Sequence, residues 1–253
     1  MGAMRDVLKV RLGKAQACLW FLGQAGYVAR SSGVTLVVDP YLSDSVGKAS
    51  PDFSRAFPVP LAPEDLEVDV FVVTHDHLDH LDPETVGAYR HKKDTLFVAP
   101  RLAAKKLASL GVPKRNIRRI DSGENRRVRG VTISGVYAVP TSADAVDTTG
   151  YRLEFENGRS VYHSSDTAFS DVLICAAPRA EVLLVCINGK WGNLNVAEAA
   201  KLAAAAKPKV AIPNHYDLMA RNSEDPEKFR AVMAKECPGV PVRILKVLEP
   251  FIW

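Results

Sequence analysis

The chain has 253 residues, of which 47% are apolar and 25% are charged, and its formal net charge at pH 7 is +4. This length and composition predict one large globular domain over residues 1–253 and exclude a disordered chain. No run approaches the roughly 20 consecutive apolar residues of a membrane span, and the small positive charge is compatible with an anionic substrate.

The N-terminal sequence and the cysteines predict a cytoplasmic protein. The first residues lack the apolar region of a signal peptide. The four cysteines, Cys18, Cys175, Cys186 and Cys237, form no C-x-x-C pair, and the first three lie in apolar runs. We expect buried free thiols in a reducing compartment.

Short apolar runs rich in β-branched residues recur along the first part of the chain, separated by turn-forming residues. They predict strands over residues 17–22, 27–30, 34–38, 68–74 and 95–100. Asp82 and Pro83 are typical of an N-cap and first position of a helix, and residues 101–111 predict a helix that ends at Gly111.

The second part of the chain repeats this order of strands and helices. Asn157 and Gly158 predict a hairpin with a type I′ turn. Helices are predicted over 195–207 and 225–236, on either side of a strand beginning at Lys209. Strands dominate each half, with helices after them, so we predict an α/β (α+β) fold in which two mixed sheets stack face to face between outer helices.

The densest basic run lies between Lys114 and Arg129. We interpret it as a solvated face, and a phosphate-facing or subunit-facing patch is the alternative. No aromatic residue interleaves it, as single-strand binding would favour, and the compact chain has no spare segment for nucleic acid.

Residues 72–82, VVTHDHLDHLD, contain three of the six histidines. In an extended segment His75 and His77 project the same way and can reach one ion, whereas on a helix they would diverge by roughly 200°. Asp79 and His80 lie further along and can turn to a second ion. The run predicts half of a two-metal site in the loop after a strand, with a solvated polar loop as the alternative.

Two later segments supply ligands of the same kind. Asp166 follows a predicted strand, where its carboxylate can bridge two ions, and His215 follows the strand that begins at Lys209. Histidine and carboxylate ligands without cysteine predict one or two divalent ions, manganese or zinc, with iron also accommodated.

The motif HDHLDH with Asp166 and His215 resembles the metallo-β-lactamase superfamily. Within it, FLGQAGYV, VVDPYLSDS, THDHLDHLDPET, YHSSDT, INGKWGNLN and IPNHYD resemble the L-ascorbate-6-phosphate lactonase family, over residues 20–217. The resemblance implies a four-layer αββα sandwich. It also implies hydrolytic chemistry, because His77 stands where the redox di-iron branch has glutamate.

The resemblance further implies a role for each residue. His75 and His77 would serve a first metal site, Asp79, His80 and His215 a second, and Asp166 would lie between them. Two more roles concern side chains around the metals. Asp39 would orient a ligand histidine, or else form a turn before Pro40, and His163 would orient a ligand, donate a proton or serve packing.

One position departs from the resembled pattern. Relatives place a third first-site histidine in the loop after the strand that ends at VYAVP, where this chain has Ala143. The first site then binds weakly, recruits Asp144 or stays empty, and an enzyme with one ion is an open alternative.

The predicted function is metal-dependent hydrolysis of a lactone of a sugar, with or without a phosphate, by metal-bound hydroxide that Asp79 orients. Asn188 and Lys190 are candidate substrate contacts, and Arg152 or Arg179 would join Lys190 at a phosphate. A phosphodiesterase and a non-catalytic metal- or ligand-binding descendant are the alternatives. The resemblance also makes a homo-oligomer an expectation.

Overall fold

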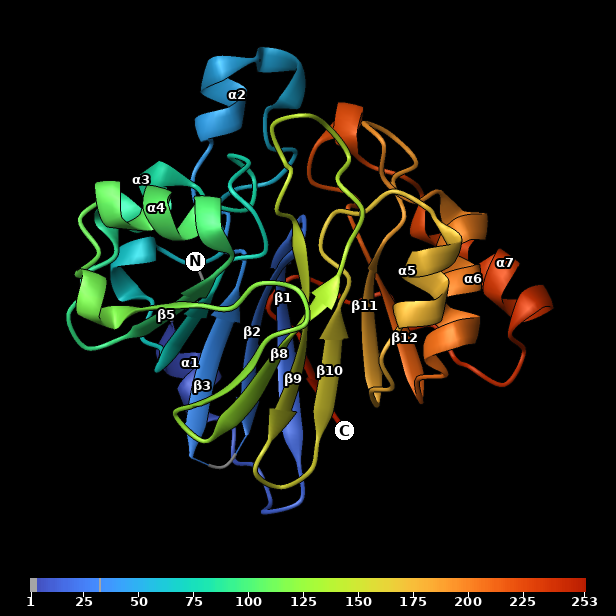
Figure 1. Cartoon of the computed structure of the whole chain (residues 1–253), viewed down its shortest axis with the longest axis horizontal. Helices are drawn as coiled ribbons and strands as arrows, with labels where there is room; N and C mark the ends of the chain where they lie inside the picture. The colour runs from blue at the N-terminus through green and yellow to red at the C-terminus, as the bar shows by residue number, and fades with distance from the viewer. Residues whose placement is uncertain (1–3, 32) are drawn as a thin grey trace.

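Two mixed β-sheets lie face to face in the computed structural model, which describes residues 4–31 and 33–253 (Figure 1). Helices cover the outer face of each sheet, so the layers follow the order helices, sheet, sheet, helices. The predicted αββα arrangement of two mixed sheets is confirmed.

The first sheet has the strand order β13-β1-β2-β3-β4-β5-β6. Its strands are β1 (Ala17–Gly23), β2 (Gly26–Ser31), β3 (Val34–Val38), β4 (Val70–Val72), β5 (Leu96–Ala99), β6 (Ile117–Arg119) and β13 (Pro250–Ile252). β1, β2 and β3 pair antiparallel, and β3 to β6 run parallel. β13 pairs antiparallel with β1, so strands from opposite ends of the chain lie side by side.

The second sheet has the strand order β12-β11-β10-β9-β8-β7. Its strands are β7 (Asn125–Val128), β8 (Val131–Tyr137), β9 (Thr149–Phe155), β10 (Ser160–His163), β11 (Val182–Cys186) and β12 (Val210–Asn214). The last three run parallel, and the first three form an antiparallel meander with β9 against β10.

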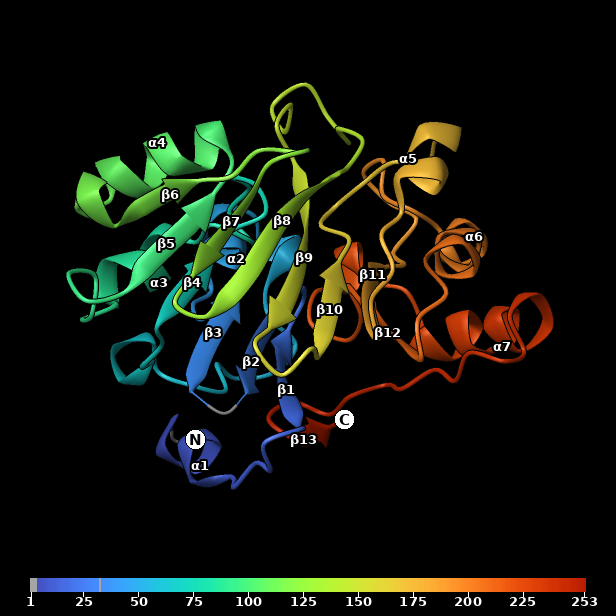
Figure 2. The same cartoon turned by 60° about the horizontal axis from the view of Figure 1, so that its bottom comes forward.

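The helices divide between the two outer faces, as Figure 2 shows. The first sheet has α1 (Met4–Lys9), α3 (Pro83–Ala88) and α4 (Arg101–Ser109), and the second has α5 (Asp171–Ala176), α6 (Val196–Ala206) and α7 (Pro226–Glu236). The short α2 (Ser45–Ala49) lies above one end of the sheets (Figure 1). The described residues also form the 3-10 turns η1 (Pro51–Phe53), η2 (Pro63–Asp65), η3 (Lys114–Asn116) and η4 (Ala220–Asn222).

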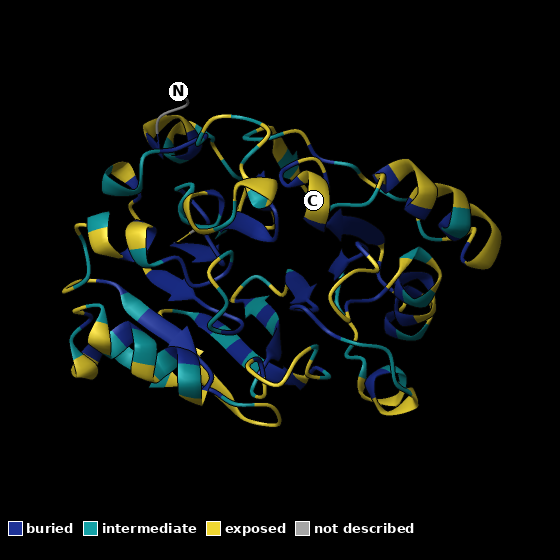
Figure 3. Cartoon of the chain, turned by 90° about the horizontal axis from the view of Figure 1, so that it is seen from above, coloured by how far each residue is buried: buried dark blue, intermediate teal, exposed yellow. Residues whose placement is uncertain are grey.

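The core has one apolar layer between the sheets and one under each set of helices. Residues 17–23 of β1 and 34–38 of β3 are buried throughout, which explains why both strands are continuous apolar runs without alternation. In the view from above, buried strands lie inside and the exposed residues gather on the outer helices and loops (Figure 3).

Three helix starts follow the chemistry expected of N-caps. Asp82 accepts hydrogen bonds from the backbone N–H groups of Glu84 and Thr85, with Pro83 as the first helical residue, as predicted. Asn195 forms a capping box with Glu198 at α6, and Asp225 caps α7.

Two local predictions are wrong. In the hairpin between β9 and β10, Gly158 has φ +81° but Asn157 is not in the left-handed region, so the turn is not type I′, which needs positive φ at both central residues. Cys175 is exposed on α5, whereas Cys18, Cys186 and Cys237 are buried. The short α5 packs only one side against the sheet, with Leu173 as its buried residue. Its apolar sequence nevertheless led us to expect that Cys175 is buried.

The basic run between Lys114 and Arg129 covers η3, β6 and β7, and most of its residues are exposed or half-buried. Arg119 pairs with Asp121 and Arg127 with Glu156. These contacts agree with a solvated face. No helix among residues 4–31 and 33–253 is long and apolar enough to cross a membrane.

Candidate metal centre

The predicted ligands meet at one end of the sandwich because they follow strands that run in the same direction. His75, His77, Asp79 and His80 lie in the loop after β4, Asp166 follows β10 and His215 follows β12. Parallel strands of one sheet present their carboxyl ends at the same edge, where loops carry functional side chains. Asp39 reaches this edge from the end of β3.

Strained backbone marks the same edge. Non-glycine residues with positive φ angles gather there, among them Gln24 (56°), Asp39 (42°), Ser165 (63°) and His215 (58°). L-amino acids other than glycine adopt this region rarely, and such conformations gather where a site fixes the direction of side chains.

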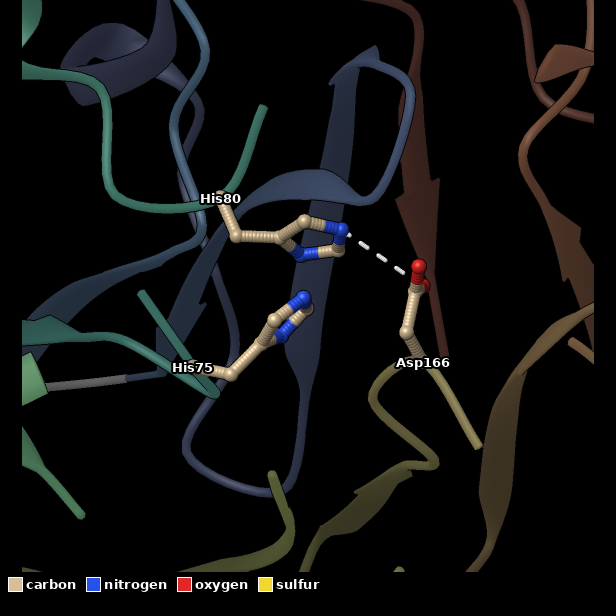
Figure 4. Close-up of side chains that lie close together, drawn as sticks. All are labelled: His75, His80 and Asp166. Atoms are coloured by element: carbon tan, nitrogen blue, oxygen red, sulfur yellow. Dashed lines mark ion pairs between the residues drawn. The ribbon is translucent and has the colours of Figure 1, made fainter. Parts of the chain in front are cut away.

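Three buried ligand atoms converge at the centre of the site. The Oδ1 atom of Asp166 lies 2.7 Å from Nε2 of His215 and 3.5 Å from Nε2 of His80. Figure 4 shows the His80 ring directed at Asp166, with His75 beside it. Within the described residues none of these three atoms has a partner at hydrogen-bond geometry. Two imidazole nitrogens and a carboxylate oxygen that are buried together without hydrogen-bond partners fit the ligand set of a shared divalent ion.

Within the described residues, two groups of three side chains have ligand atoms that lie within 4.8 Å of one another. One group is His75, His80 and Asp166, and the other is Asp79, His80 and His215. The second group has the composition expected for the second site. In the first group His75 associates with His80 and Asp166, whereas His77 belongs to neither group.

His77 contacts other side chains on the site's outer side. Its Nδ1 lies 3.1 Å from Nε2 of His75, and its Nε2 lies 3.3 Å from Oδ1 of Asp144. Ala143 is exposed in the adjoining loop, so no imidazole completes a set with His75 and His77 there. Asp144 approaches His77, as expected of a substitute ligand, but its side chain is 78% exposed.

Asp39 holds His80 in place. One carboxylate oxygen accepts hydrogen bonds from the Thr74 hydroxyl (2.6 Å) and from Nδ1 of His80 (2.8 Å), and the other accepts from the Thr74 backbone N–H (2.8 Å). With its proton on Nδ1, the His80 ring turns Nε2 toward Asp166. A carboxylate behind a ligand histidine fixes the tautomer and ring direction in this way.

Gln24, in the turn between β1 and β2, is a site residue that the sequence did not indicate. Its amide nitrogen lies 2.9 Å from Oδ2 of Asp79 and 3.0 Å from Nδ1 of His215, so one side chain touches ligand candidates from two loops. Gln24 lies in the segment FLGQAGYV that contributes to the family resemblance, but nothing in that segment singled out the glutamine as a contact of the ligands.

Asp166 is also held by groups that the sequence did not single out. The Asn193 amide donates to its Oδ2 at 2.8 Å, and the Thr148 hydroxyl donates to its backbone carbonyl at 2.9 Å. These contacts leave Oδ1 directed at His80 and His215.

His163 lies beneath the site. Its Nδ1 accepts the backbone N–H of Ser165 (3.1 Å), and its Nε2 lies 2.9 Å from the carbonyl of Ala25. Burial lowers the pKa of His163, which agrees with a neutral ring bonded at both nitrogens. Because both ring nitrogens contact backbone groups, these contacts do not support the expectation that His163 donates a proton to a substrate. They fit the other expected role, in which His163 orients Asp166 through the strained residue Ser165.

Asn188 and Lys190 contact η4 and the residue after it, and neither bonds to a ligand candidate in the described structure. The Asn188 amide donates to the side chain of Asn222 at 2.6 Å, and the Lys190 ammonium donates to the carbonyl of Ser223 at 2.9 Å. Arg152 donates to the carbonyl of Arg179 and pairs with Glu154. The structure does not gather these cations into a phosphate site.

Electrostatic coupling between the ligands is large in the metal-free protein. Burial lowers the pKa of His80, but the carboxylates of Asp166, Asp79 and Asp39 outweigh it and hold that pKa well above its ordinary value. Burial raises the pKa of Asp166, yet His215 and His80 hold it well below its usual range. A proton must leave His80 before Nε2 can bind an ion, so ion binding is favoured as pH rises.

A cavity of about 510 Å³ opens above these ligands. Its polar lining includes His77, Asp79 and Asp166 from the predicted set, together with Asp144 and Asn193. Five apolar side chains also line it: Val46, Phe53, Leu78, Trp191 and Met219. The site therefore combines a polar, ligand-bearing floor with an apolar wall.

The sequence profile described as the beta-lactamase superfamily domain matches residues 35–216, which include Asp39 and every predicted ligand. The chain is 30% identical over 240 residues to a UPF0173 metal-dependent hydrolase of Methanopyrus kandleri, covering 91% of this chain and 96% of the relative. The chain belongs to the UPF0173 metal-dependent hydrolases of the beta-lactamase superfamily. A UPF0173 relative from Aeropyrum pernix is 30% identical over 252 residues, covering 93% and 97% of the two chains.

Solved structures share the fold of this UPF0173 hydrolase. A metallo hydrolase of Ignicoccus hospitalis superposes with a TM-score of 0.74 at 21% identity, covering 94% of this chain and 98% of that one. An isothiocyanate hydrolase from Delia radicum gut bacteria superposes with the same TM-score of 0.74 at 20% identity, covering 92% and 98%. These likenesses establish the metallo-β-lactamase fold that the motifs predicted.

Proposed function

We propose that this metal-dependent hydrolase cleaves the carbonyl–oxygen bond of a lactone or related carboxylic ester. The observation that carries the proposal is the convergence of the unbonded His80, His215 and Asp166 atoms at the floor of an open cavity. Those three side chains, with Asp79 and His75, would hold one or two divalent ions, manganese or zinc, with iron also accommodated. A bound ion would acidify a water molecule and polarise the substrate carbonyl.

Asp79 is placed to take part in the chemistry. It lines the cavity, and its Oδ2 is held by the amide groups of Gln24 (2.9 Å) and Asn222 (3.4 Å). A carboxylate fixed in this way can accept a hydrogen bond from the attacking water and aim it at a carbonyl above the floor.

Two observations favour carbonyl chemistry over the phosphodiesterase alternative. His77 belongs to neither candidate ligand group, and Ala143 stands where a third histidine for His75 and His77 is expected. Hydrolysis of phosphodiesters in this fold would depend more strictly on two ions. Among the described residues, no lysine or arginine lines the cavity, so a phosphate would find no side-chain cation there. The same observation favours an unphosphorylated lactone over a sugar phosphate.

Three other expectations belong to this proposal. The likeness to L-ascorbate-6-phosphate lactonases supports a lactone as the bond cleaved. We also propose that residues 1–253 form one catalytic domain and that the chain associates with copies of itself. Membership in a family of metal-dependent hydrolases argues against a non-catalytic descendant.

The test combines metal content with a substrate panel. Protein loaded with manganese or zinc should hydrolyse neutral lactones and leave bis-p-nitrophenyl phosphate intact, while Asp166→Asn should lose bound metal and turnover together. Cleavage of the phosphodiester alone would transfer the proposal to phosphorus chemistry. Full activity in Asp166→Asn would reject the assigned centre.

A further inference from the structure

The wall of the cavity carries information about the substrate that the ligands do not. Val46 comes from α2, Phe53 from η1, Leu78 from the histidine loop, Trp191 from the loop after β11 and Met219 from the segment before η4. Figure 1 shows α2 and the loops of the second sheet meeting above the same end of the sandwich. Four segments of the chain, one of them carrying both α2 and η1, thus contribute apolar side chains to one opening.

Two of these side chains are exposed to solvent although they are large and apolar. Trp191 is 63% exposed and Leu78 is 38% exposed. The Trp191 ring lies 5.7 Å from the Phe53 ring, so an apolar surface continues across the opening. Single exposed apolar side chains are ordinary, but a contiguous patch beside a polar site is typical of a binding surface.

The segment that carries Val46 and Phe53 is held rigidly. The Arg55 guanidinium donates to the carbonyls of Tyr41 and Ser43 and lies 5.2 Å from the centre of the Tyr41 ring. The backbone N–H of Ala56 donates to the Leu218 carbonyl at 2.7 Å. This part of the wall is formed before any ligand arrives, which lowers the entropic cost of binding.

Trp191 is joined to the ligand floor through its own turn. Its φ is 56°, and two residues later Asn193 donates to Oδ2 of Asp166. A Cβ on Gly192 would lie 2.6 Å from the Thr141 carbonyl, so this turn also packs closely against the Thr141 loop. The distance between apolar wall and polar floor is therefore fixed by one short turn.

The charges of the side chains that line the cavity also favour an uncharged substrate. Asp79, Asp144 and Asp166 are its carboxylates, His77 is its remaining ionisable side chain, and no cationic side chain is found among the described lining residues. Divalent ions would offset the carboxylates without leaving a separate site for an anionic tail.

We propose that the substrate is an uncharged ester or lactone with an alkyl or aryl arm, and that this arm lies against Phe53, Leu78 and Trp191. This inference rests on the proposed function, because it places the reacting carbonyl at the Asp79 and Asp166 floor. It goes further by naming the group that the enzyme recognises. Burial of the arm supplies binding free energy, and the metal centre supplies the chemistry.

The test uses metal-loaded enzyme and γ-lactones with side chains of none to six carbons, beside 6-phosphogluconolactone as the anionic substrate. Full burial of a methylene is worth roughly fourfold in binding, and burial against a half-open wall about twofold, so six carbons should raise kcat/KM by roughly 60-fold. Trp191→Ala should remove most of this gain, and Trp191→Phe should restore part of it. Val172→Ala, at an exposed position on α5, is the control and should leave the series unchanged.

The matching γ-lactams, which lack the cleavable ester, separate recognition from catalysis. Their dissociation constants, measured by calorimetry, should fall with chain length in the native enzyme and remain flat in Trp191→Ala. Equal binding of short and long lactams, or preference for the phosphorylated lactone, would overturn the apolar-arm inference. Chain-length-dependent lactam binding without hydrolysis of any lactone would uphold it and overturn the proposed reaction instead.

Discussion

Asp39 is the residue whose single substitution tests most directly how the metal centre is held. Asparagine tolerates a positive φ, so Asp39→Asn should keep the backbone while weakening the hydrogen bond to Nδ1 of His80. We expect metal affinity to fall by roughly 10- to 100-fold, as for other carboxylates behind ligand histidines. Competition with a metal-chelating dye measures it, and unchanged affinity would show that His80 needs no such support.

Ala143 is the position where this chain lacks the histidine of the resembled family. Ala143→His should raise the metal content toward two ions per chain, because the new imidazole would complete a set with His75 and His77. Val146→His is the matched control, since Val146 is exposed in the same loop but its chain neighbours do not line the cavity, whereas Ser142 and Asp144 on either side of Ala143 do. Elemental analysis after dialysis decides the matter, and equal content in both variants would contradict a crippled first site.

His163 gives a prediction about pH. Burial lowers its folded pKa below the unfolded value of about 6.5, so the unfolded state binds more protons and stability is lost as pH falls through that value. Between pH 7.5 and pH 5.5 the unfolding free energy of the unmutated protein should fall by up to about 1.4 kcal/mol more than that of His163→Gln. The glutamine keeps an amide toward Ala25 but cannot titrate. Urea unfolding at both pH values measures the difference, and equal losses would place the proton elsewhere.

Among single residues, the metal-ligand candidates could be predicted from the sequence better than the residues that hold them. Histidine and aspartate after strand ends carry a chemical signal, and all six predicted ligands lie at one edge. Gln24 and Asn193 carry none, because amides are ordinary in turns and their partners are distant in sequence. His75 groups with His80 and Asp166 and not with His77, and this depends on ring directions that sequence spacing does not determine.

The elements illustrate which local patterns determine structure. Continuous apolar runs and helix caps gave β1, β3, α4, α6 and α7 within about two residues at each end. The predicted strand 68–74 shortens to Val70–Val72, although backbone hydrogen bonds of Asp69 and Val73 to the neighbouring strands continue just beyond both ends. α2 and β13 were not predicted, since a short segment has too little pattern and takes its form from tertiary contacts.

The two aspartate caps provide a stability prediction for the elements. Asp82 is buried and also accepts a hydrogen bond from the Thr85 hydroxyl, whereas Asp225 is exposed and caps its helix by accepting from the backbone N–H of Glu227. We expect Asp82→Ala to cost about 2 kcal/mol and Asp225→Ala about 1 kcal/mol of unfolding free energy. Urea denaturation of the two variants at equal metal content checks the order, and equal costs would mean that burial of a cap adds nothing.

For the molecule as a whole, the metal should contribute to stability as well as to catalysis. The converging atoms of His80, His215 and Asp166 find no hydrogen-bond geometry within the described chain, so an ion that binds only the folded state should stabilise it. At an ion concentration of 100 times Kd the gain is about 2.7 kcal/mol. Calorimetry with chelator and after re-addition of manganese or zinc measures it, and an unchanged Tm would argue against the buried centre.

The pairing of β13 with β1 also bears on how the protein is made. β1 leaves the ribosome more than 200 residues before the strand that covers its outer edge, residues 250–252. Throughout translation the nascent chain therefore carries an open, fully apolar strand to which a neighbouring chain could add. Pairing with residues 250–252 ends this exposure, which ties the yield of native protein to a strand that carries no candidate metal ligand.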